Sequence, residues 1–404
     1  MTDTATDFSL PLHMRRDRFR PDADLERIRD SGEIPRVRTA FGADAYLVTR
    51  YDDVRQVLGD AATYSNAGSA ALTRPDAPPL SEREQEQMRA GQLLAQDPPE
   101  HTRLRRFLTR EFTQRRMTRL EPRITEIVDE HLDALEAAGP GADLVTLFAL
   151  PVPSMVICEL LGVPYTDRDE FTARSTRLLD VSLPEQERRA VSRENRAYMS
   201  RLVDGALADP GEDILGMLIR EHGEEISHDE LVGIASLLLI AGHETTSNML
   251  SLGTLALLED PEQAALLRSD PELARPAVEE LLRWLSIVHT GVVRVTTTDT
   301  VLRDTPIPAQ SLVMCSLPAA NRDSASGFDD PARLDVTRGA AGHVAFGHGV
   351  HHCLGAPLAR MEMATAFPAL LRRFPTLAPA GPVPPEAFRA YHFVYGMHTL
   401  PVTW

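Results

Sequence analysis

The chain has 404 residues, of which 43% are hydrophobic and 25% are charged, a globular composition that excludes a disordered or collagen-like chain. Its 59 acidic residues exceed its 42 lysines and arginines by 17, so the molecule as a whole repels nucleic acid and anionic lipid. Three cysteines are too few, and too widely spaced, for a disulfide framework, and they fit a reducing cytoplasm.

The first twenty residues mix charges among the apolar side chains, which excludes the apolar core of a signal peptide. The longest nearly apolar stretch, residues 231–242, has about twelve residues where a bilayer span needs about twenty. No repeat and no linker divides the chain. We therefore expect a soluble, monomeric, single domain over residues 1–404, with residues 1–20 as a loosely ordered segment.

In chain order, a small β region is predicted near residues 46–48 and a long loop with one broken helix over residues 66–98. Loops of that length are typically functional, and we expect this one to act as a movable lid. Residues 100–282 show helical spacing of apolar residues, with glycine and proline stops. Short β-branched runs follow, and a helix returns after Pro357. The fold class predicted is mainly α with a small β region.

One long helix is predicted from a capping box, Ser227 with Glu230, to Pro261. Its middle is apolar, so it is expected to run through the core. The run Gly242-His243-Glu244-Thr245-Thr246 interrupts it with polar groups. Two interpretations are open: a polar patch where helices cross, or an active-site groove in which a carboxylate and a hydroxyl face a ligand from a locally opened helix.

A glycine-rich segment, residues 346–357, places Cys353 just before a helix that Pro357 begins. A helix N-terminus favours a thiolate, and the glycines allow the backbone to approach something flat and large. Three interpretations are open. Zinc could bind with His348, His351 and His352, Cys353 could be the nucleophile of a hydrolase, or it could be a buried structural cysteine.

The pattern Phe346-x-x-Gly349-x-x-x-Cys353-x-Gly355 resembles the haem-binding loop of the cytochrome P450 monooxygenases. Two further signatures resemble theirs in order and spacing: Ala241-Gly242-x-Glu244-Thr245 of the oxygen-activation helix, and Glu280-Leu281-Leu282-Arg283. The resemblance runs from about residue 20 to Trp404, and details at residues 319–323 and 400–402 resemble the soluble bacterial branch. It implies a single triangular prism, largely helical, with a small β region to one side.

The resemblance also implies roles for residues. Cys353 would be the axial ligand of the iron of haem b, and Glu244 with Thr245 would deliver protons to bound O2. Glu280 and Arg283 would form a buried structural ion pair, with Arg333 as third member. Further haem contacts would come from the loop residues Phe346, Gly349 and Gly355, and propionate contacts from His101, Arg105, Arg294 and His351.

No glycine-rich nucleotide fingerprint follows a strand, so the electrons are expected from a ferredoxin with its reductase. A basic helix near residues 100–120 offers Arg103, Arg106 and Arg110 as a docking patch, and a solvated helix face is the alternative. Nucleic acid is a weaker partner hypothesis, because the net charge opposes it.

The activity implied is hydroxylation of a bulky, largely apolar small molecule, in natural-product metabolism. His289 and Thr290 are polar candidates near the substrate, and a surface role is as well supported for them. Other activities of the same fold remain open: a nitric oxide reductase, a peroxygenase or a non-catalytic haem sensor. The substrate-lining residues implied by the resemblance are Leu94, Leu237, Ile240, Ala241, Val288, Val292 and Phe393.

Overall fold

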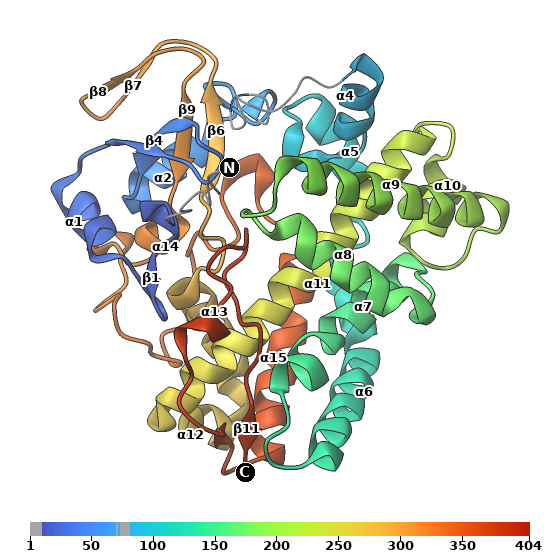
Figure 1. Cartoon of the computed structure of the whole chain (residues 1–404), viewed down its shortest axis with the longest axis vertical. Helices are drawn as coiled ribbons and strands as arrows, with labels where there is room; N and C mark the ends of the chain where they lie inside the picture. The colour runs from blue at the N-terminus through green and yellow to red at the C-terminus, as the bar shows by residue number, and fades with distance from the viewer. Residues whose placement is uncertain (1–9, 70–71, 73–80) are drawn as a thin grey trace, which may run out of the picture.

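The computed structural model of the chain describes residues 10–69, 72 and 81–404. Figure 1 shows a broad end that carries the main sheet on one side and α9 with α10 on the other, and a narrow end at α12 and the C-terminus. The α-helices are α1 (Ala23–Ser31), α2 (Tyr51–Gly59), α4 (Glu82–Arg89), α5 (Glu100–Thr109), α6 (Gln114–Ala138), α7 (Pro151–Leu161), α8 (Arg168–Leu179), α9 (Glu185–Ala208), α10 (Ile214–His222), α11 (His228–Glu259), α12 (Pro261–Ser269), α13 (Ala274–Leu285), α14 (Leu317–Ala320) and α15 (Ala356–Arg373).

Strands occupy little of the chain. The main sheet has five strands in the order β3-β4-β9-β6-β5, in which β4 pairs with β9 in parallel and the other neighbours are antiparallel. The strands are β1 (Arg16–Asp17), β2 (Arg20–Pro21), β3 (Arg36–Arg38), β4 (Asp44–Val48), β5 (Tyr64–Ser65), β6 (Val292–Thr296), β7 (Thr300–Leu302), β8 (Thr305–Ile307), β9 (Leu312–Cys315), β10 (Ala378–Pro379) and β11 (Val402–Thr403).

The central strand β9 is buried on both faces, which explains its continuous apolar run. Because side chains alternate along a strand, Val313 and Cys315 pack in the cluster that holds α2, while Leu312 and Met314 pack in the cluster that holds α1. The sheet joins chain segments that are about 250 residues apart, residues 36–65 and 292–315. The small β region predicted from the sequence is therefore confirmed.

The long helix α11 runs through the middle of the molecule, as its apolar sequence predicted (Figure 1). Its capping box is formed, since Ser227 and Glu230 satisfy each other's backbone N–H groups. The helix is continuous through Gly242, so the expected local opening is wrong. The glycine has another cause: a Cβ there would lie 2.7 Å from Cγ1 of Ile157, so α7 crosses α11 too closely for any side chain.

The N-terminal expectation is wrong for the residues that the structure describes. Residues 1–9 lie outside the described part, whereas residues 10–20 are well packed. Met14 is fully buried, and the guanidinium of Arg16 donates to the carbonyl oxygens of Leu285 and Ser286, both at 2.7 Å. These contacts join the start of the chain to the end of α13.

The segment 66–98, expected as a lid, is described only at residues 66–69, 72 and 81–98. Its second part is anchored. A Cβ on Gly91 would collide with the carbonyl oxygen of Glu230, and Gln92 donates to the carbonyl oxygen of Gly233 at 3.1 Å. Residues 91–92 thus lie directly against α11. Within the described residues, no helix is long and apolar enough to cross a membrane.

Candidate functional site

The loop before α15 presents Cys353 from a constrained backbone. Its N–H donates to the carbonyl oxygen of Phe346 at 2.9 Å, which closes the loop. Gly349 has φ +73°, and a Cβ there would lie 2.5 Å from the carbonyl oxygen of Leu58. That glycine is needed for packing against α2, and the expected approach of the loop backbone to a flat ligand stays a prediction. Gly355, in contrast, has nothing within 4 Å of its Cβ position.

The Cys353 side chain is exposed, whereas Cys158 and Cys315 are buried. Surrounding protein raises the pKa of the Cys353 thiol, although the N–H groups of Gly355 and Ala356 and the charge of Arg105 lower it. The expected preference for a thiolate is therefore not a property of the helix terminus alone, and a cation or metal must complete it.

The zinc interpretation lacks its ligands. Among the residues that the structure describes, no group of three or more His, Cys, Asp or Glu side chains is arranged to hold a metal ion. His351 turns instead toward α5, where its ring lies 4.2 Å from that of His101. The histidines of the motif therefore do not converge on Cys353 as a zinc site would require.

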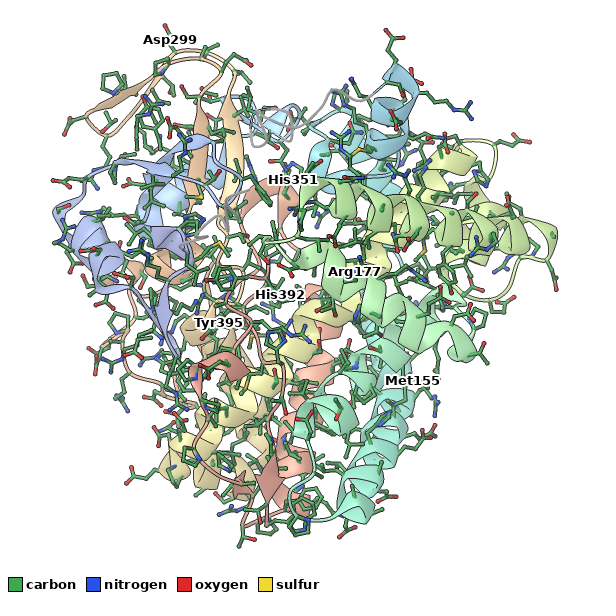
Figure 2. All side chains as sticks on the ribbon, in the orientation of Figure 1. Met155, Arg177, Asp299, His351, His392 and Tyr395 are labelled. Atoms are coloured by element: carbon green, nitrogen blue, oxygen red, sulfur yellow. The ribbon has the colours of Figure 1, made fainter. Side chains whose placement is uncertain are left out.

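Four basic side chains gather at this loop, three from two other regions of the chain and one from the loop itself. His101 and Arg105 lie on α5, Arg294 lies on β6, and His351 lies in the loop, at the centre of the broad end in Figure 2. Both ring nitrogens of His101 and of His351 are buried without a hydrogen-bond partner. The two guanidinium groups donate only to carbonyl oxygens, Arg105 to His352 at 2.6 Å and Arg294 to Val293 at 2.9 Å.

The pKa values of the two histidines reflect burial among positive charges. Burial first, and then the charges of His101 and Arg294, lower the pKa of His351 to about 4, although Asp97 raises it. Burial and then Arg105 lower the pKa of His101. Asp97 is the nearby carboxylate, but it accepts from the N–H groups of Asn66 and Ala67, at 2.8 and 3.2 Å. Two carboxylates of a bound molecule would satisfy this cluster, so the residues fit the propionates of haem.

On α11, Glu244 is buried and ionised. Arg389 donates to its Oε2 at 3.1 Å and Thr176 donates to its Oε1 at 2.8 Å, while Nε2 of His243 lies 3.5 Å from Oε1. Burial raises the pKa of Glu244, but the nearby His243, the charge of Arg389 and the hydrogen bond of Thr176 hold it at about 2. The sequence analysis assigned no role to Thr176, His243 or Arg389. Thr176 and Arg389 lie outside the sequence motifs, and His243 occupies the unspecified position of one.

The neighbouring Thr245 lies on a different face of α11. Its Oγ1 donates to the carbonyl oxygen of Ala241 at 2.7 Å. Ala241 is exposed and Leu237, Ile240, Gly242 and Thr245 are half-buried, whereas Leu238, Leu239, His243 and Glu244 between them are buried. The middle of this core helix therefore has one accessible face. The other expected lining residues are accessible too: Val288 and Val292 are half-buried, and Leu94 and Phe393 are exposed.

The C-terminal segment closes against α8. The N–H of Phe393 donates to the carbonyl oxygen of Leu179 at 2.7 Å. The backbones of His392 and Asp180 form an isolated antiparallel β-bridge. In Figure 2, His392 lies between Arg177 of α8 and Tyr395. His289 and Thr290 bond the same segment, at the carbonyl oxygens of His392 and Phe393. Both side chains are buried, so the surface role is wrong, and contact with a ligand stays a prediction.

The predicted buried ion pair of Glu280 and Arg283 is present, but its third side chain is not the predicted one. Arg283 and Glu280 are fully buried and joined by two hydrogen bonds, at 2.7 and 2.8 Å. The third side chain is Arg338, whose Nε lies 3.1 Å from Oε1 of Glu280. Arg333 was the wrong choice: its side chain is 57% exposed and pairs with Asp335.

The expected docking arginines differ in how free they are. Arg103 forms ion pairs with Glu100 and Glu230, so its charge is already paired within the chain, and its docking role stays a prediction. Arg106 is 70% exposed and lies 3.6 Å from Glu225. Arg110 is exposed at the end of α5.

Comparison with known proteins gives consistent similarities. The family model described as "Cytochrome P450" matches residues 29–183 and 268–401. "Cytochrome P450 FAS1" of Rhodococcoides fascians is 49% identical over 98% of both chains. "Vitamin D3 dihydroxylase" of Streptomyces griseolus is 42% identical over 94% of this chain and 92% of its own. The crystal structure of CYP105P1 in complex with filipin I has a TM-score of 0.89 and 40% identity, over 96% of this chain and 97% of that one. The predicted fold is confirmed.

Proposed function

This chain belongs to the cytochrome P450 family of monooxygenases, and we propose that it is a bacterial hydroxylase of bulky, largely apolar small molecules that holds haem b through Cys353. One observation carries the cofactor assignment. Within the part of the chain that the structure describes, two histidines and two arginines around the Cys353 loop have no hydrogen-bonded carboxylate, although the chain carries 59 acidic residues. A dianionic planar ligand with a metal that accepts a thiolate matches both halves of the site.

Haem, when bound, supplies the iron at which O2 is activated. The protein's residues then have separate tasks. Cys353 holds the iron from the loop, and Phe346, Gly349 and Gly355 shape that loop. His101, Arg105, Arg294 and His351 orient the group through its propionates. The proposed fold unit is one domain over residues 1–404.

Proton delivery is assigned to Glu244 and Thr245. The Thr245 hydroxyl lies on the accessible face of α11, and it donates its hydrogen bond to the carbonyl oxygen of Ala241. Glu244 is ionised and has three neighbours that hold it. A proton therefore reaches the accessible face only when Glu244 first exchanges one of those partners, Thr176, His243 or Arg389, for water.

The substrate class follows from the side chains along the accessible face. Leu237, Ile240 and Ala241 of α11, Val288 and Val292 near β6, Leu94 and Phe393 are all apolar. Such a wall favours burial of apolar surface, at about 25 cal/mol per Å², and offers no ion pair to a small acid. The names of two relatives agree with this class, since one is a vitamin D3 dihydroxylase and another was crystallised with filipin I.

The electron donor is proposed to be a ferredoxin with its reductase, and the enzyme to be a cytoplasmic monomer that binds neither nucleic acid nor membrane. The free cysteines support a reducing compartment. Arg106 and Arg110 remain as exposed cations on α5, the helix that also carries the propionate ligands. An acidic redoxin would dock there close to the haem edge.

The test begins with the cofactor. The reduced protein with carbon monoxide should show the red-shifted Soret band of a thiolate-ligated haem, and Cys353→Ser should abolish it while Cys158→Ser retains it. Loss of the band in Cys158→Ser alone would refute the ligand. Substrate class is tested by spectral titration with large apolar ring systems against small carboxylic acids, in wild type and Val292→Phe. Tight binding of the acids, or no effect of Val292→Phe on the large ligands, would refute the class.

A further inference from the structure

Three polar side chains that the proposed reaction does not use form a chain beside the Cys353 loop. His343 comes just before the loop, Glu279 lies on α13, and Arg360 lies on α15, seven residues after Cys353. None of the three was singled out by the sequence motifs. Each contacts the next, and the last one reaches the loop itself.

The first member is an oriented donor. His343 is buried, and its Nδ1 accepts the N–H of Ala345 at 3.1 Å. In the neutral imidazole the proton must therefore be on Nε2. That nitrogen lies 3.2 Å from Oε2 of Glu279, to which it donates. The ring thus fixes the position of the carboxylate.

The second contact is bidentate. Nε of Arg360 donates to Oε1 of Glu279 at 2.5 Å, and Nη2 donates to Oε2 at 2.9 Å. Burial raises the pKa of Glu279, but His343 and Arg360 together hold it at about 2, so the carboxylate stays charged. A planar guanidinium held by two parallel hydrogen bonds has little freedom to move.

The third contact brings the cation to the loop. The guanidinium carbon of Arg360 lies 4.7 Å from the ring centre of Phe346, within the range of a cation–π contact. The carbonyl oxygen of Phe346 accepts the N–H of Cys353, so the Phe346 ring and the Cys353 sulfur belong to one closed loop. The positive charge of Arg360 therefore lies against the loop that presents the Cys353 sulfur.

We propose that Arg360 is a positioning residue that holds a positive charge beside the Cys353 sulfur, that Glu279 and His343 hold it there, and that this triad sets the reduction potential of the haem iron. Reduction adds one negative charge to the iron–thiolate unit, and a fixed cation nearby stabilises that reduced state. The inference rests on Cys353 being the iron ligand, as proposed above.

The experiment is an equilibrium redox titration of the substrate-free holoprotein, followed by absorbance. Arg360→Gln should lower the ratio of reduced to oxidised protein at a fixed potential on the order of tenfold, which is about 59 mV for one electron. Arg360→Lys keeps the charge and should recover at least half of that shift. Glu279→Gln removes the opposing negative charge, while its amide oxygen can still accept from Arg360, so the potential should rise.

The opposite signs of Arg360→Gln and Glu279→Gln separate a charge effect from a merely structural role, which would move both variants in one direction. Arg373→Gln is the matched control: it lies thirteen residues further along the same helix, about 20 Å away, and pairs with Glu136 and Asp133. Its potential should equal that of wild type.

An unchanged potential in Arg360→Gln, or shifts of the same sign in the two variants, would overturn the triad. If Arg360→Gln does not retain the thiolate Soret band, Glu279→Gln decides alone, and a potential that is unchanged or lowered overturns the proposal. A wild-type protein without that band would overturn the cysteine ligand first and this inference with it, so the two failures are distinguishable.

Discussion

The buried carboxylate of Glu244 gives the sharpest test of the site as described. It joins three elements: α11, which carries it, α8 through Thr176, and the C-terminal segment through Arg389. Glu244→Gln keeps the volume and an acceptor oxygen but removes the charge. Arg389 would then be left buried without an anion, so we expect the variant to be destabilised as well as impaired in proton delivery.

The magnitude can be worked out from the pKa. An ordinary glutamate has a pKa of 4.5 and Glu244 has one of about 2, and at about 1.36 kcal/mol per pH unit the difference is about 3 kcal/mol. Breaking a buried ion pair typically costs 3–5 kcal/mol, about the same. Because the folded pKa is depressed, this stability is fully present above about pH 4.5 and is lost as the pH falls from 4.5 toward 2.

The assay is guanidinium unfolding of haem-loaded wild type and Glu244→Gln at equal concentration, followed by circular dichroism and by the Soret band. At pH 7 the difference in unfolding free energy should be about 3 kcal/mol, and it should shrink below pH 4.5. Asp229 lies on α11 like Glu244, and Asp229→Asn, which breaks its partly exposed ion pair with Arg196 of α9, should cost no more than about 1 kcal/mol. A cost for Glu244→Gln below about 1 kcal/mol, or one that does not change with pH, would refute the ion-pair reading.

Three further predictions follow from side chains whose surroundings differ. Arg338→Gln should destabilise the fold by about 3 kcal/mol because it leaves the buried carboxylate of α13 with one partner fewer, whereas Arg333→Gln should cost under about 1 kcal/mol in the same unfolding assay; equal costs would contradict the corrected network. Thr245→Ala should leave spectral substrate binding intact and lower product formed per NADPH consumed, and unchanged coupling would remove it from proton delivery. Arg106→Glu should raise the apparent KM for ferredoxin and flatten the salt dependence of that KM. Arg103→Glu should instead lower thermal stability, because it breaks two ion pairs. An unaltered salt response in Arg106→Glu would place docking elsewhere.

Local signals in the sequence predicted local structure well. The capping box at Ser227 begins α11, Pro357 lies in the first turn of α15, and the β-branched run at residues 292–295 is β6. Each of these depends on residues within a few positions of one another, where backbone geometry decides the outcome. The helical half and the small sheet could therefore be read from the chain without knowing how they pack.

The partners of the buried charges could not be predicted in the same way. Arg389 is 145 residues from Glu244, and nothing near either residue marks the pair. Arg333 and Arg338 are both arginines after one proline-containing turn, and only the path of the chain decides which side chain points to Glu280. The same holds for Gly242, whose absent side chain is explained by Ile157 on α7. Tertiary contacts between distant segments carry this information, and a single sequence does not display it.

The basic side chains of the protein differ in whether a carboxylate pairs with them, and this difference bears on the cofactor. Arg103, Arg338, Arg360 and Arg389 each have a carboxylate of the chain within 3.1 Å. These four cations have an anion that the protein supplies, whereas the guanidinium groups of Arg16 and Arg322 donate to carbonyl oxygens. Among the described residues, His101, Arg105, Arg294 and His351 likewise have carbonyl oxygens or no hydrogen-bond partner, and here four basic groups lie in one place. Burial and the neighbouring positive charges lower the pKa of both histidines. Such a cluster lowers the stability of the fold until an anion binds. Haem binding should therefore stabilise the fold most strongly through this cluster. His351→Gln should lower haem affinity more than it lowers the stability of the protein without haem.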